Sequence, residues 1–280
     1  MSVRIVTDST CDLPDPVATA LGIKVVPLYI RVGNRDYLDG IDMSREEFYR
    51  KLPNLAEHPT TAVPSPQKFH AIYDMLADEG ASEVLSIHIS NTLSGTVDVA
   101  RAAAEETTSV PVTVLDSRQL SMGTGFLVQL AAEMARAGNT VQQILPRLEN
   151  QVKRTQTWAL LDTLKYLRRS GRMNRVVSTM GELLQIKPIL KMFDGVSGVE
   201  KVRTRRNGLA QLIKMLNQFS PFERIAFLYS DAREEAQALQ ETVRNLLPAT
   251  DVIFGVINPV IGAHIGTGVV GFSTVSREPG

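Results

Sequence analysis

Short hydroxyl and carboxylate side chains follow three apolar segments that have the pattern of buried strands. They are Thr7-Asp8-Ser9, the stretch from Ser90 to Thr96, and Asp116-Ser117. Each polar stretch precedes a helical pattern, and ligands of doubly wound sheets collect outside the carboxyl ends of the strands. A helix N-terminus carries unpaired N–H groups and a partial positive charge, so it stabilises a phosphate or a carboxylate. The three stretches together predict an anion site that needs no lysine.

Ser94-Gly95-Thr96 is the stretch with the most direct chemistry. The two hydroxyls could donate to an anion, and Gly95 would let a ligand approach the backbone. Alternatively, Ser94 only caps its own helix, because Ser and Thr are preferred at that position. A third interpretation, a nucleophile, lacks the G-x-S-x-G turn that presents a reactive serine. This loop alone does not decide between the cap and the ligand.

His264 and Arg172 are two further residues with chemical potential. His264 is the polar aromatic residue of the glycine-rich stretch 258–268, and Arg172 follows a helical pattern that ends at Gly171. Arg172 either binds the last carbonyls of that helix or pairs with an anion. His264 is either a plain loop residue or a functional one. The four histidines and the single cysteine show no metal-ligand spacing, so we expect neither a metal nor a cofactor.

Two nucleotide-binding motifs are excluded. GTGVVG (266–271) matches the dinucleotide pattern, but a strand-like segment follows it where the mechanism requires a helix. The chain contains no G-x-x-x-x-G-K-[ST] sequence, so we expect no ATP site of the P-loop type. Ser94 with His264 leaves a hydrolase or acyltransferase open as an alternative function.

The elements that must position these residues change character along the chain. In the first half, apolar strands alternate with helices, which predicts right-handed βαβ units and a mostly parallel sheet. The predicted strands are 3–9, 24–32, 83–89 and 111–117, and Gly33-Asn34 is a predicted hairpin turn. The predicted helices include 66–79 and 126–137, and a capping box of Thr140 and Gln143 predicts a further helix that ends near Lys153. Beyond residue 157 the pattern around Gly195 indicates a hairpin, typical of antiparallel pairing. We therefore expect an α/β protein with two domains, 1–157 with a mostly parallel sheet and 158–280 with an antiparallel sheet.

Charge and composition exclude several classes of partner. The 280 residues carry 30 basic and 30 acidic side chains, so no net field attracts nucleic acid. No apolar run approaches the roughly 20 residues that span a bilayer, and the N-terminal stretch does not resemble a signal peptide. We expect a soluble cytoplasmic protein that binds no nucleic acid.

Taken together, the motifs resemble the DegV family, the fatty-acid-binding subunits of bacterial fatty acid kinase. The matching stretches are TDSTCDLP (7–14), PTTAVPSP (59–66), ISNTLSGT (89–96), LDSRQLSMGTG (115–125), LDTLKYLRRSGR (161–172), KPIL (187–190), DG (194–195) and NPVIGAHIGTG (258–268). Each stretch is weak alone, but their order and spacing are specific. The resemblance implies a parallel α/β domain followed by an α/β domain with an antiparallel sheet.

The resemblance also implies a function and a site. A long-chain fatty acid is buried between or along the domains and is presented to a separate ATP-dependent kinase, which makes an acyl-phosphate. The hydroxyls of Thr61 and Ser94 and the backbone N–H of Gly95 hold the carboxylate. His264 and Arg172 lie close to this end, for phosphotransfer or for docking of the kinase. The chain would then be a carrier and not an enzyme, with Ser94 as an anion ligand.

One departure from the family pattern affects this site. The family usually has Ser-Gln after the binding threonine, giving T-S-Q-P-S, whereas Ala62-Val63 stand here. Thr61 is retained, so the resemblance still implies headgroup binding. Hydrogen bonds from the usual Ser and Gln are lost, so the resemblance does not fix the geometry of this loop.

The fatty acid also needs an apolar wall, and the stretch 180–193 offers one. The expected wall residues are Met180, Leu183, Leu184, Ile186 and Ile189, each of which could instead belong to an ordinary core. A carrier for another apolar carboxylate would share the headgroup site and differ only in this wall.

A basic cluster follows the predicted hairpin and consists of Arg203, Arg205 and Arg206. It is either a solvated face or a surface for the kinase. A transient contact with anionic lipid headgroups during fatty acid exchange is a further hypothesis.

Overall fold

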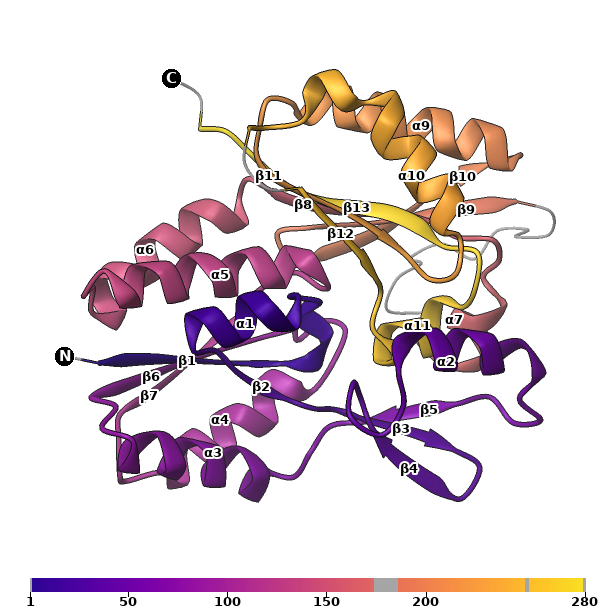
Figure 1. Ribbon diagram of the computed structural model, residues 1–280. Coiled ribbons are helices and arrows are strands. Elements are labelled where there is room, and N and C mark those ends of the chain that lie inside the picture. The colour runs from indigo at the N-terminus through magenta and orange to yellow at the C-terminus, as the bar shows by residue number, and fades with distance from the viewer. Residues whose placement is uncertain (1, 174–185, 250–251, 279–280) are drawn as a thin grey trace.

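The computed structural model describes residues 2–173, 186–249 and 252–278 (Figure 1). The strands are β1 (Val3–Asp8), β2 (Lys24–Val26), β3 (Tyr29–Val32), β4 (Arg35–Leu38), β5 (Thr60–Ala62), β6 (Glu83–His88), β7 (Val112–Asp116), β8 (Thr155–Leu160), β9 (Lys187–Phe193), β10 (Val196–Val202), β11 (Phe222–Tyr229), β12 (Ile253–Val256) and β13 (Val270–Ser276). The helices are α1 (Asp15–Leu21), α2 (Arg45–Lys51), α3 (Pro66–Asp78), α4 (Thr96–Glu106), α5 (Met122–Arg136), α6 (Val141–Val152), α7 (Lys165–Arg169), α9 (Arg205–Phe219), α10 (Arg233–Thr242) and α11 (Pro259–Ile265), with a 3-10 turn η1 (Ser9–Cys11).

The first sheet has the order β2-β1-β6-β7, and all its strands are parallel. This confirms the parallel sheet that the alternating pattern predicts. The polar stretches that end β1, β6 and β7 consequently meet at one edge. Two hydrogen bonds join them there: Ile89 N–H donates to Asp8 Oδ2 at 3.1 Å, and Ser117 N–H donates to His88 O at 3.0 Å.

The second sheet has the order β10-β9-β8-β13-β11-β12, and only β11 and β12 pair in parallel. The predicted hairpin is confirmed as β9 and β10, with Asp194 and Gly195 in the turn. Helices α9 and α10 cover the outer face of this sheet, while α5 and α6 lie between the two sheets (Figure 1). Together the parallel and the mixed sheet give the expected α/β class.

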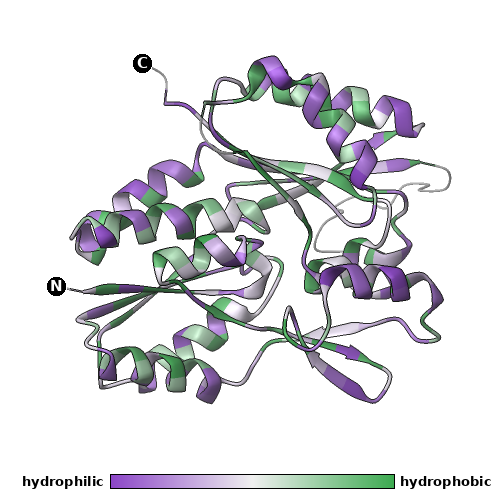
Figure 2. Cartoon of the chain, viewed as in Figure 1, coloured by the Kyte–Doolittle hydropathy of each residue, from purple (hydrophilic) through white to green (hydrophobic). Residues whose placement is uncertain are grey.

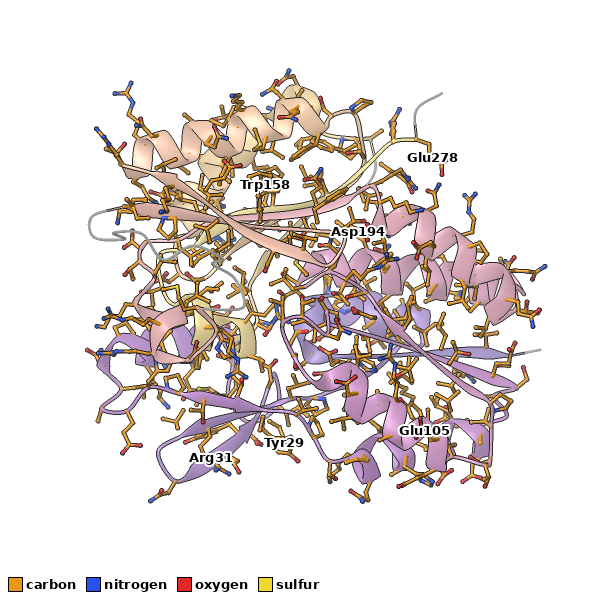
Figure 3. All side chains as sticks on the ribbon, turned by 180° about the vertical axis from the view of Figure 1, so that it is seen from behind. Tyr29, Arg31, Glu105, Trp158, Asp194 and Glu278 are labelled. Atoms are coloured by element: carbon orange, nitrogen blue, oxygen red, sulfur yellow. The ribbon has the colours of Figure 1, made fainter. Side chains whose placement is uncertain are left out.

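A third, antiparallel sheet has the order β4-β3-β5. The hairpin of β3 and β4 confirms the predicted turn at Gly33-Asn34, but the pairing of β5 with β3 was not predicted. The sequence pattern indicates one strand over 24–32, but Pro27 interrupts it, because proline has no N–H to donate to a ladder. Strand β2 therefore stays in the parallel sheet and β3 turns away into the small one. Figure 3 shows Tyr29 and Arg31 of β3 on the opposite side of the molecule from Trp158 of the six-stranded sheet.

Two helices differ from the expected ones. Helix α5 begins at Met122 and not at Phe126. Helix α11 was missed altogether, because the glycines around His264 are typical of a loop. A Cβ added at Gly262 would lie 2.5 Å from Tyr49 Oη, and one at Gly266 would lie 2.1 Å from the Tyr166 ring. These glycines therefore serve close packing of a helix against two aromatic rings.

The main hydrophobic core contains residues of both halves of the chain. Ile5 and Ile87 of the parallel sheet share it with Ala226 and Val275 of the six-stranded sheet, and the apolar faces of α5 and α6 fill the space between. Hydrophobic residues concentrate on these inner faces, with hydrophilic ones on the outer turns of the helices (Figure 2). The division at residue 157 stays a prediction.

Asp39, in the turn after β4, has an unusual titration that affects stability. Burial raises the pKa of Asp39 to about 7, with Asp12 and Asp8 also raising it and Ser9 and Arg45 lowering it. Because this folded-state pKa lies above the ordinary value of 3.8, the native state takes up a proton that the unfolded state does not. Ionised Asp39 therefore destabilises the fold progressively as the pH rises towards 7, and the cost is complete above it.

We expect Asp39→Asn to become more stable relative to the wild type as the pH rises from 4 to 8. The whole change is about 4 kcal/mol at most, since each pKa unit corresponds to about 1.4 kcal/mol. Urea unfolding at several pH values measures it, with the exposed Asp98→Asn as the control. A stability difference that does not vary with pH would contradict the raised pKa.

Candidate functional site

Thr61, Ser94, Gly95, Arg172 and His264 all line one cavity of about 840 Å³, a volume that includes the space at its mouth. They come from β5, the turn before α4, the segment after α7, and α11. The structure thus brings together every residue that the resemblance assigns to the site, from positions up to 203 residues apart.

A hydrogen bond links the third sheet to α11 inside this cavity. Thr61 Oγ1 lies 3.0 Å from His264 Nε2. Both side chains are partly buried. Ile30 of β3 pairs with Thr61 of β5 in the small sheet and so fixes its backbone. The pairing of β3 with β5, which the sequence did not predict, therefore positions a predicted site residue.

Ser94 and Gly95 lie at the N-terminus of α4. Gly95 is the N-cap residue, and no side chain caps the helix, so the interpretation of Ser94 as a cap is wrong. The Ser94 hydroxyl instead lies 2.8 Å from the hydroxyl of the buried Thr96. A Cβ added at Gly95 would meet nothing within 4 Å, which leaves the exposed backbone at this helix end open to a ligand.

Arg172 binds backbone carbonyls after α7 and also lines the cavity. Its backbone N–H donates to Leu167 O at 3.1 Å, and its Nη1 donates to Ser170 O at 3.0 Å, so it binds carbonyls after α7. The same side chain lines the cavity. It brings a permanent positive charge to the end where the hydroxyls gather.

Ala62 and Val63, which replace the usual Ser and Gln of the family pattern, also line this cavity. The wall beside Thr61 is therefore more apolar than the family pattern implies.

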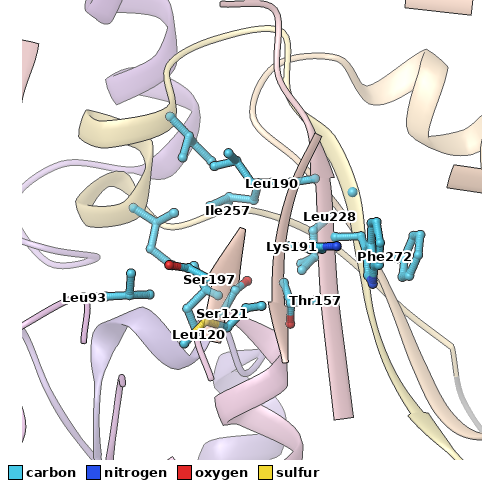
Figure 4. Close-up of a pocket in the computed structure, with 16 residues that line it drawn as sticks. Leu93, Leu120, Ser121, Thr157, Leu190, Lys191, Ser197, Leu228, Ile257 and Phe272 are labelled. Carbon is cyan, nitrogen blue, oxygen red and sulfur yellow. The ribbon is translucent and has the colours of Figure 1, made fainter. Parts of the chain in front are cut away.

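A second chamber of about 580 Å³, shown in Figure 4, lies beside the first. Five aliphatic residues line both spaces: Leu93, Leu120, Leu190, Ile261 and Ile265. Met192, Leu228 and Ile257 line only the second chamber. Trp158 and Phe272 also contribute to its lining, although their side chains belong to the core cluster that contains Ile189. In Figure 4, Leu93 and Phe272 lie on opposite sides of the chamber. The two spaces are therefore adjacent, and we call them together the tunnel: the first contains the polar site residues, and the second is lined mainly by apolar residues.

Four polar residues line the second chamber: Ser121, Thr157, Lys191 and Ser197. Lys191 Nζ lies 3.4 Å from Glu200 Oε1. Ser121 Oγ donates to Asp12 Oδ2 at 2.5 Å. Thr157 Oγ1 lies 2.9 Å from Ser273 Oγ. Because these hydroxyls are already bonded, the wall behaves as an apolar surface.

The expected wall residues are largely different from the observed ones. Met180, Leu183 and Leu184 lie outside the described residues. Ile186 and Ile189 line neither chamber. Alternate residues of a strand point to opposite faces, so Leu190 and Met192 of β9 face the tunnel while Ile189 packs into the core beneath α9.

A Ser–His–Asp arrangement exists below the cavity floor, at residues other than those considered for a hydrolase. His88 Nδ1 lies 2.9 Å from Asp8 Oδ2, and His88 Nε2 lies 2.7 Å from Ser86 Oγ. Burial would raise the pKa of Asp8, but hydrogen bonds and the charge of His88 hold the pKa below its usual value. All three side chains are completely buried, so this chain of hydrogen bonds is structural.

Ser94 and His264 do not form a nucleophile–base pair in this structure. Their hydroxyl and imidazole groups bond Thr96 and Thr61 respectively. The nucleophile interpretation therefore gains no geometric support, because a reactive serine needs a base within hydrogen-bond reach.

The basic cluster after β10 is only partly available to a partner. Arg205 pairs with Glu235, with Nε 2.9 Å from Oε2, while Arg203 and Arg206 are exposed. Arg205 is therefore a structural ion pair between α9 and α10.

The described residues contain neither a membrane-spanning helix nor a metal site. None of the helices within 2–173, 186–249 and 252–278 has the length and apolar character needed to cross a membrane. In the same ranges, no three His, Cys, Asp or Glu side chains gather as a metal site requires.

Comparison with known proteins gives consistent results along the whole chain. The DegV family model, described as "Uncharacterised protein, DegV family", matches residues 2–277. A DegV domain-containing protein of Deinococcus radiodurans is 38% identical over 283 residues, covering 100% of this chain and 99% of that protein. One from Streptomyces coelicolor is 36% identical over 280 residues, covering 98% and 99%.

Solved structures show the same fold. A DegV family protein from Thermus thermophilus, described as fatty acid binding, has a TM-score of 0.89 and 34% identity, covering 99% of this chain and 100% of that one. DegV from Bacillus subtilis, described as a fatty acid binding protein, has a TM-score of 0.91 and 29% identity over the same shares.

Fold and cavity thus define an α/β protein with an apolar tunnel that ends in hydroxyl groups at a helix N-terminus. The chain belongs to the DegV family.

Proposed function

We propose that this protein binds a long-chain fatty acid, with its carboxylate at Thr61, Ser94 and Gly95 and its hydrocarbon chain in the tunnel. The observation that carries the proposal is the arrangement of the site: the cavity with these three residues lies directly beside the apolar chamber and shares five lining residues with it. The fatty-acid-binding structures from Thermus thermophilus and Bacillus subtilis support it.

The polar end supplies the donors that a carboxylate needs. If His264 Nε2–H donates to Thr61 Oγ1, the Thr61 hydroxyl hydrogen is available for the ligand. Thr96 and Ser94 form a similar relay, in which Thr96 donates to Ser94 and Ser94 to the ligand. Hydrogen bonds to a charged group contribute about 1.5–3 kcal/mol each. The backbone N–H of Gly95 and the dipole of α4 add to them.

The apolar chamber supplies the larger part of the binding energy. A chain of about sixteen carbons buries methylenes worth up to roughly 12 kcal/mol at ~0.8 kcal/mol each. Ordering of the chain and loss of free motion offset a large part of this. Tail burial therefore provides affinity, and the headgroup site provides orientation and selects a carboxylate.

The proposal extends to presentation of the bound acid to a separate ATP-dependent kinase that forms an acyl-phosphate. Its support is the position of Arg172 and His264, which line the end of the cavity where the carboxylate is proposed to lie. A permanent cation beside an anionic acyl-phosphate favours its formation. The protein would act as a carrier, and that role stays a prediction, as does a cytoplasmic location.

Arg172→Ala and His264→Ala are expected to reduce acyl-phosphate formation with the kinase about tenfold or more, with a smaller loss of fatty acid affinity. The reason is that both groups act where the phosphate is added, while most affinity comes from the tail. Titration with palmitate and hydroxylamine trapping of the acyl-phosphate measure the two effects. Equal losses would instead assign both residues to the carboxylate site.

Mass spectrometry of the purified protein, intact under native conditions and after organic extraction, tests the binding proposal. We expect one fatty acid per chain that is released on denaturation. An empty protein that also fails to bind added palmitate would refute it. If a different apolar carboxylate is extracted, the proposed carboxylate site stands and only the identity of the ligand changes.

The hydrolase or acyltransferase alternative has its own test. If a fluorophosphonate labels Ser94 and the protein turns over ester substrates, the protein is an enzyme of this kind and not a carrier. We expect neither.

Membrane contact during fatty acid exchange remains a separate proposal, supported by the exposed Arg203 and Arg206. Arg203→Ala/Arg206→Ala is expected to slow fatty acid transfer from anionic vesicles and to leave transfer from neutral vesicles unchanged. Equal rates from both kinds of vesicle would exclude it.

A further inference from the structure

We propose that Asp12 is the positioning residue of the headgroup site: its buried carboxylate anchors α11 and thereby holds His264 against Thr61. The inference rests on the proposed fatty acid binding, because it concerns the same site. Asp12 lines neither chamber. It therefore acts on the ligand only through other residues.

The Asp12 carboxylate accepts hydrogen bonds from three separate parts of the chain. Oδ1 accepts from the backbone N–H of Asn258 at 2.8 Å, from Asn258 Nδ2 at 3.1 Å, and from Arg45 Nη1 at 2.8 Å. Oδ2 accepts from Ser121 Oγ at 2.5 Å. The carboxylate is fully buried, with a side-chain exposure of 0%. Breaking such a network leaves buried polar groups without partners.

Asn258 carries the effect of Asp12 to α11. While its N–H and Nδ2 bind Asp12, its Oδ1 accepts from Ile261 N at 2.9 Å and so caps the helix. Arg45 Nη1 also donates to Val256 O, which fixes the chain just before the cap. Helix α11 has only 7 residues, so the position of its cap largely sets the position of the whole helix.

Helix α11 provides one wall of the site. His264 contacts Thr61 at the polar end, and Ile261 and Ile265 line both chambers. A displaced cap would therefore loosen the His264–Thr61 hydrogen bond and the junction of the tunnel together.

The fourth hydrogen bond connects Asp12 to the opposite wall. Ser121 precedes α5, and its neighbour Leu120 lines both chambers. Asp12 and Ser121 both have positive φ, 56° and 52°. Non-glycine residues hold such angles only where the surroundings determine them, and they cluster at functional sites. Asp12 thus joins the Leu120 wall to the α11 wall across the tunnel.

Asp12→Asn tests the inference because it preserves shape and removes the charge. An amide has one acceptor oxygen, so its NH₂ group must face either Ser121 or the donors of Asn258 and Arg45. We expect palmitate affinity to fall about tenfold. We also expect the ring ¹⁵N signals of His264 and the signal of ¹³C-carboxyl-labelled palmitate to shift, since both groups lose their fixed positions.

A matched control separates positioning from loss of stability. Leu216→Ala removes a fully buried side chain of α9 that lines neither chamber, and it destabilises the fold by about 2–5 kcal/mol. At a temperature where it stays folded, its palmitate affinity and both NMR signals should match the wild type. Shifts in Leu216→Ala as large as those in Asp12→Asn would overturn the inference.

A double-mutant cycle tests the route through Thr61. Thr61→Val should weaken palmitate binding less in the Asp12→Asn background than in the wild type, because the His264–Thr61 contact is already loosened there. Additive losses would overturn the inference. If Asp12→Asn does not fold, Asn258→Ser serves in both experiments, because it keeps a capping hydroxyl and loses only the Nδ2 bond to Asp12.

Failure of the inference differs from failure of the proposed function. A wild type that binds no fatty acid refutes the proposed function. A wild type that binds palmitate, with Asp12→Asn unchanged in affinity and in the His264 signals, refutes only the role of Asp12.

Discussion

Leu190→Trp is expected to abolish palmitate binding while leaving octanoate binding nearly unchanged. Leu190 lines both chambers at their junction, so a bulkier indole there closes the way to the second one. An octanoate chain needs only the first chamber. Palmitate would lose burial of about eight methylenes, worth up to roughly 6 kcal/mol, which corresponds to a loss of affinity of up to about ten-thousandfold.

Isothermal titration with both acids measures this effect, and strand geometry provides the control. Ile189 is the next residue on β9, is fully buried, and lies on the opposite face. Ile189→Ala should cost about 2–5 kcal/mol of stability, yet leave the preference for palmitate over octanoate as in the wild type. Palmitate binding to Leu190→Trp with wild-type affinity would show that the tail takes another route.

Ser94→Ala is expected to weaken palmitate binding about 30- to 100-fold, because a partly buried carboxylate loses a charge-assisted donor worth about 2–3 kcal/mol. The loss should depend on the charge of the ligand. Methyl palmitate, which has the same tail and no charge, should lose much less affinity. Competition against a fluorescent fatty acid measures both ligands.

Thr92→Val is the matched control for Ser94→Ala. It removes a hydroxyl from the same turn, but Thr92 does not line the cavity and binds Ser90 and Gly195 instead. Its palmitate affinity should equal that of the wild type. A Ser94→Ala protein that binds palmitate equally well would remove Ser94 from the carboxylate site.

Much of the fold could be predicted because local patterns are strong there. The capping box of Thr140 and Gln143 opens α6 as expected, and the hairpin of β9 and β10 follows its glycine turn. Prediction was wrong where tertiary contacts override local preference. Pro27 interrupts the predicted strand, so β3 lies in the small sheet with β4 and β5. Gly262 and Gly266 have no side chain, which allows α11 and its C-terminal end to pack against the rings of Tyr49 and Tyr166.

The tunnel wall shows the same limit at the level of single residues. Apolar residues on β9 alternate between two buried faces, so hydrophobicity alone cannot distinguish Ile189 in the core from Leu190 in the tunnel. One face packs beneath α9, and the other lines the tunnel. Only the arrangement of the layers shows which is which.

The sequence by itself determined the α/β class, a helix that begins within Ser94–Thr96, and, through its motifs, the family and a set of polar residues that line one cavity. These depend on the order of residues within short stretches, which is local information. The tertiary structure alone decided that Thr61 and His264 are in contact, that Asp12 bonds both Asn258 and Ser121, and that the two chambers lie side by side. Contacts between residues more than 200 positions apart depend on how the sheets and α11 pack, because every such contact is set by the positions of whole elements.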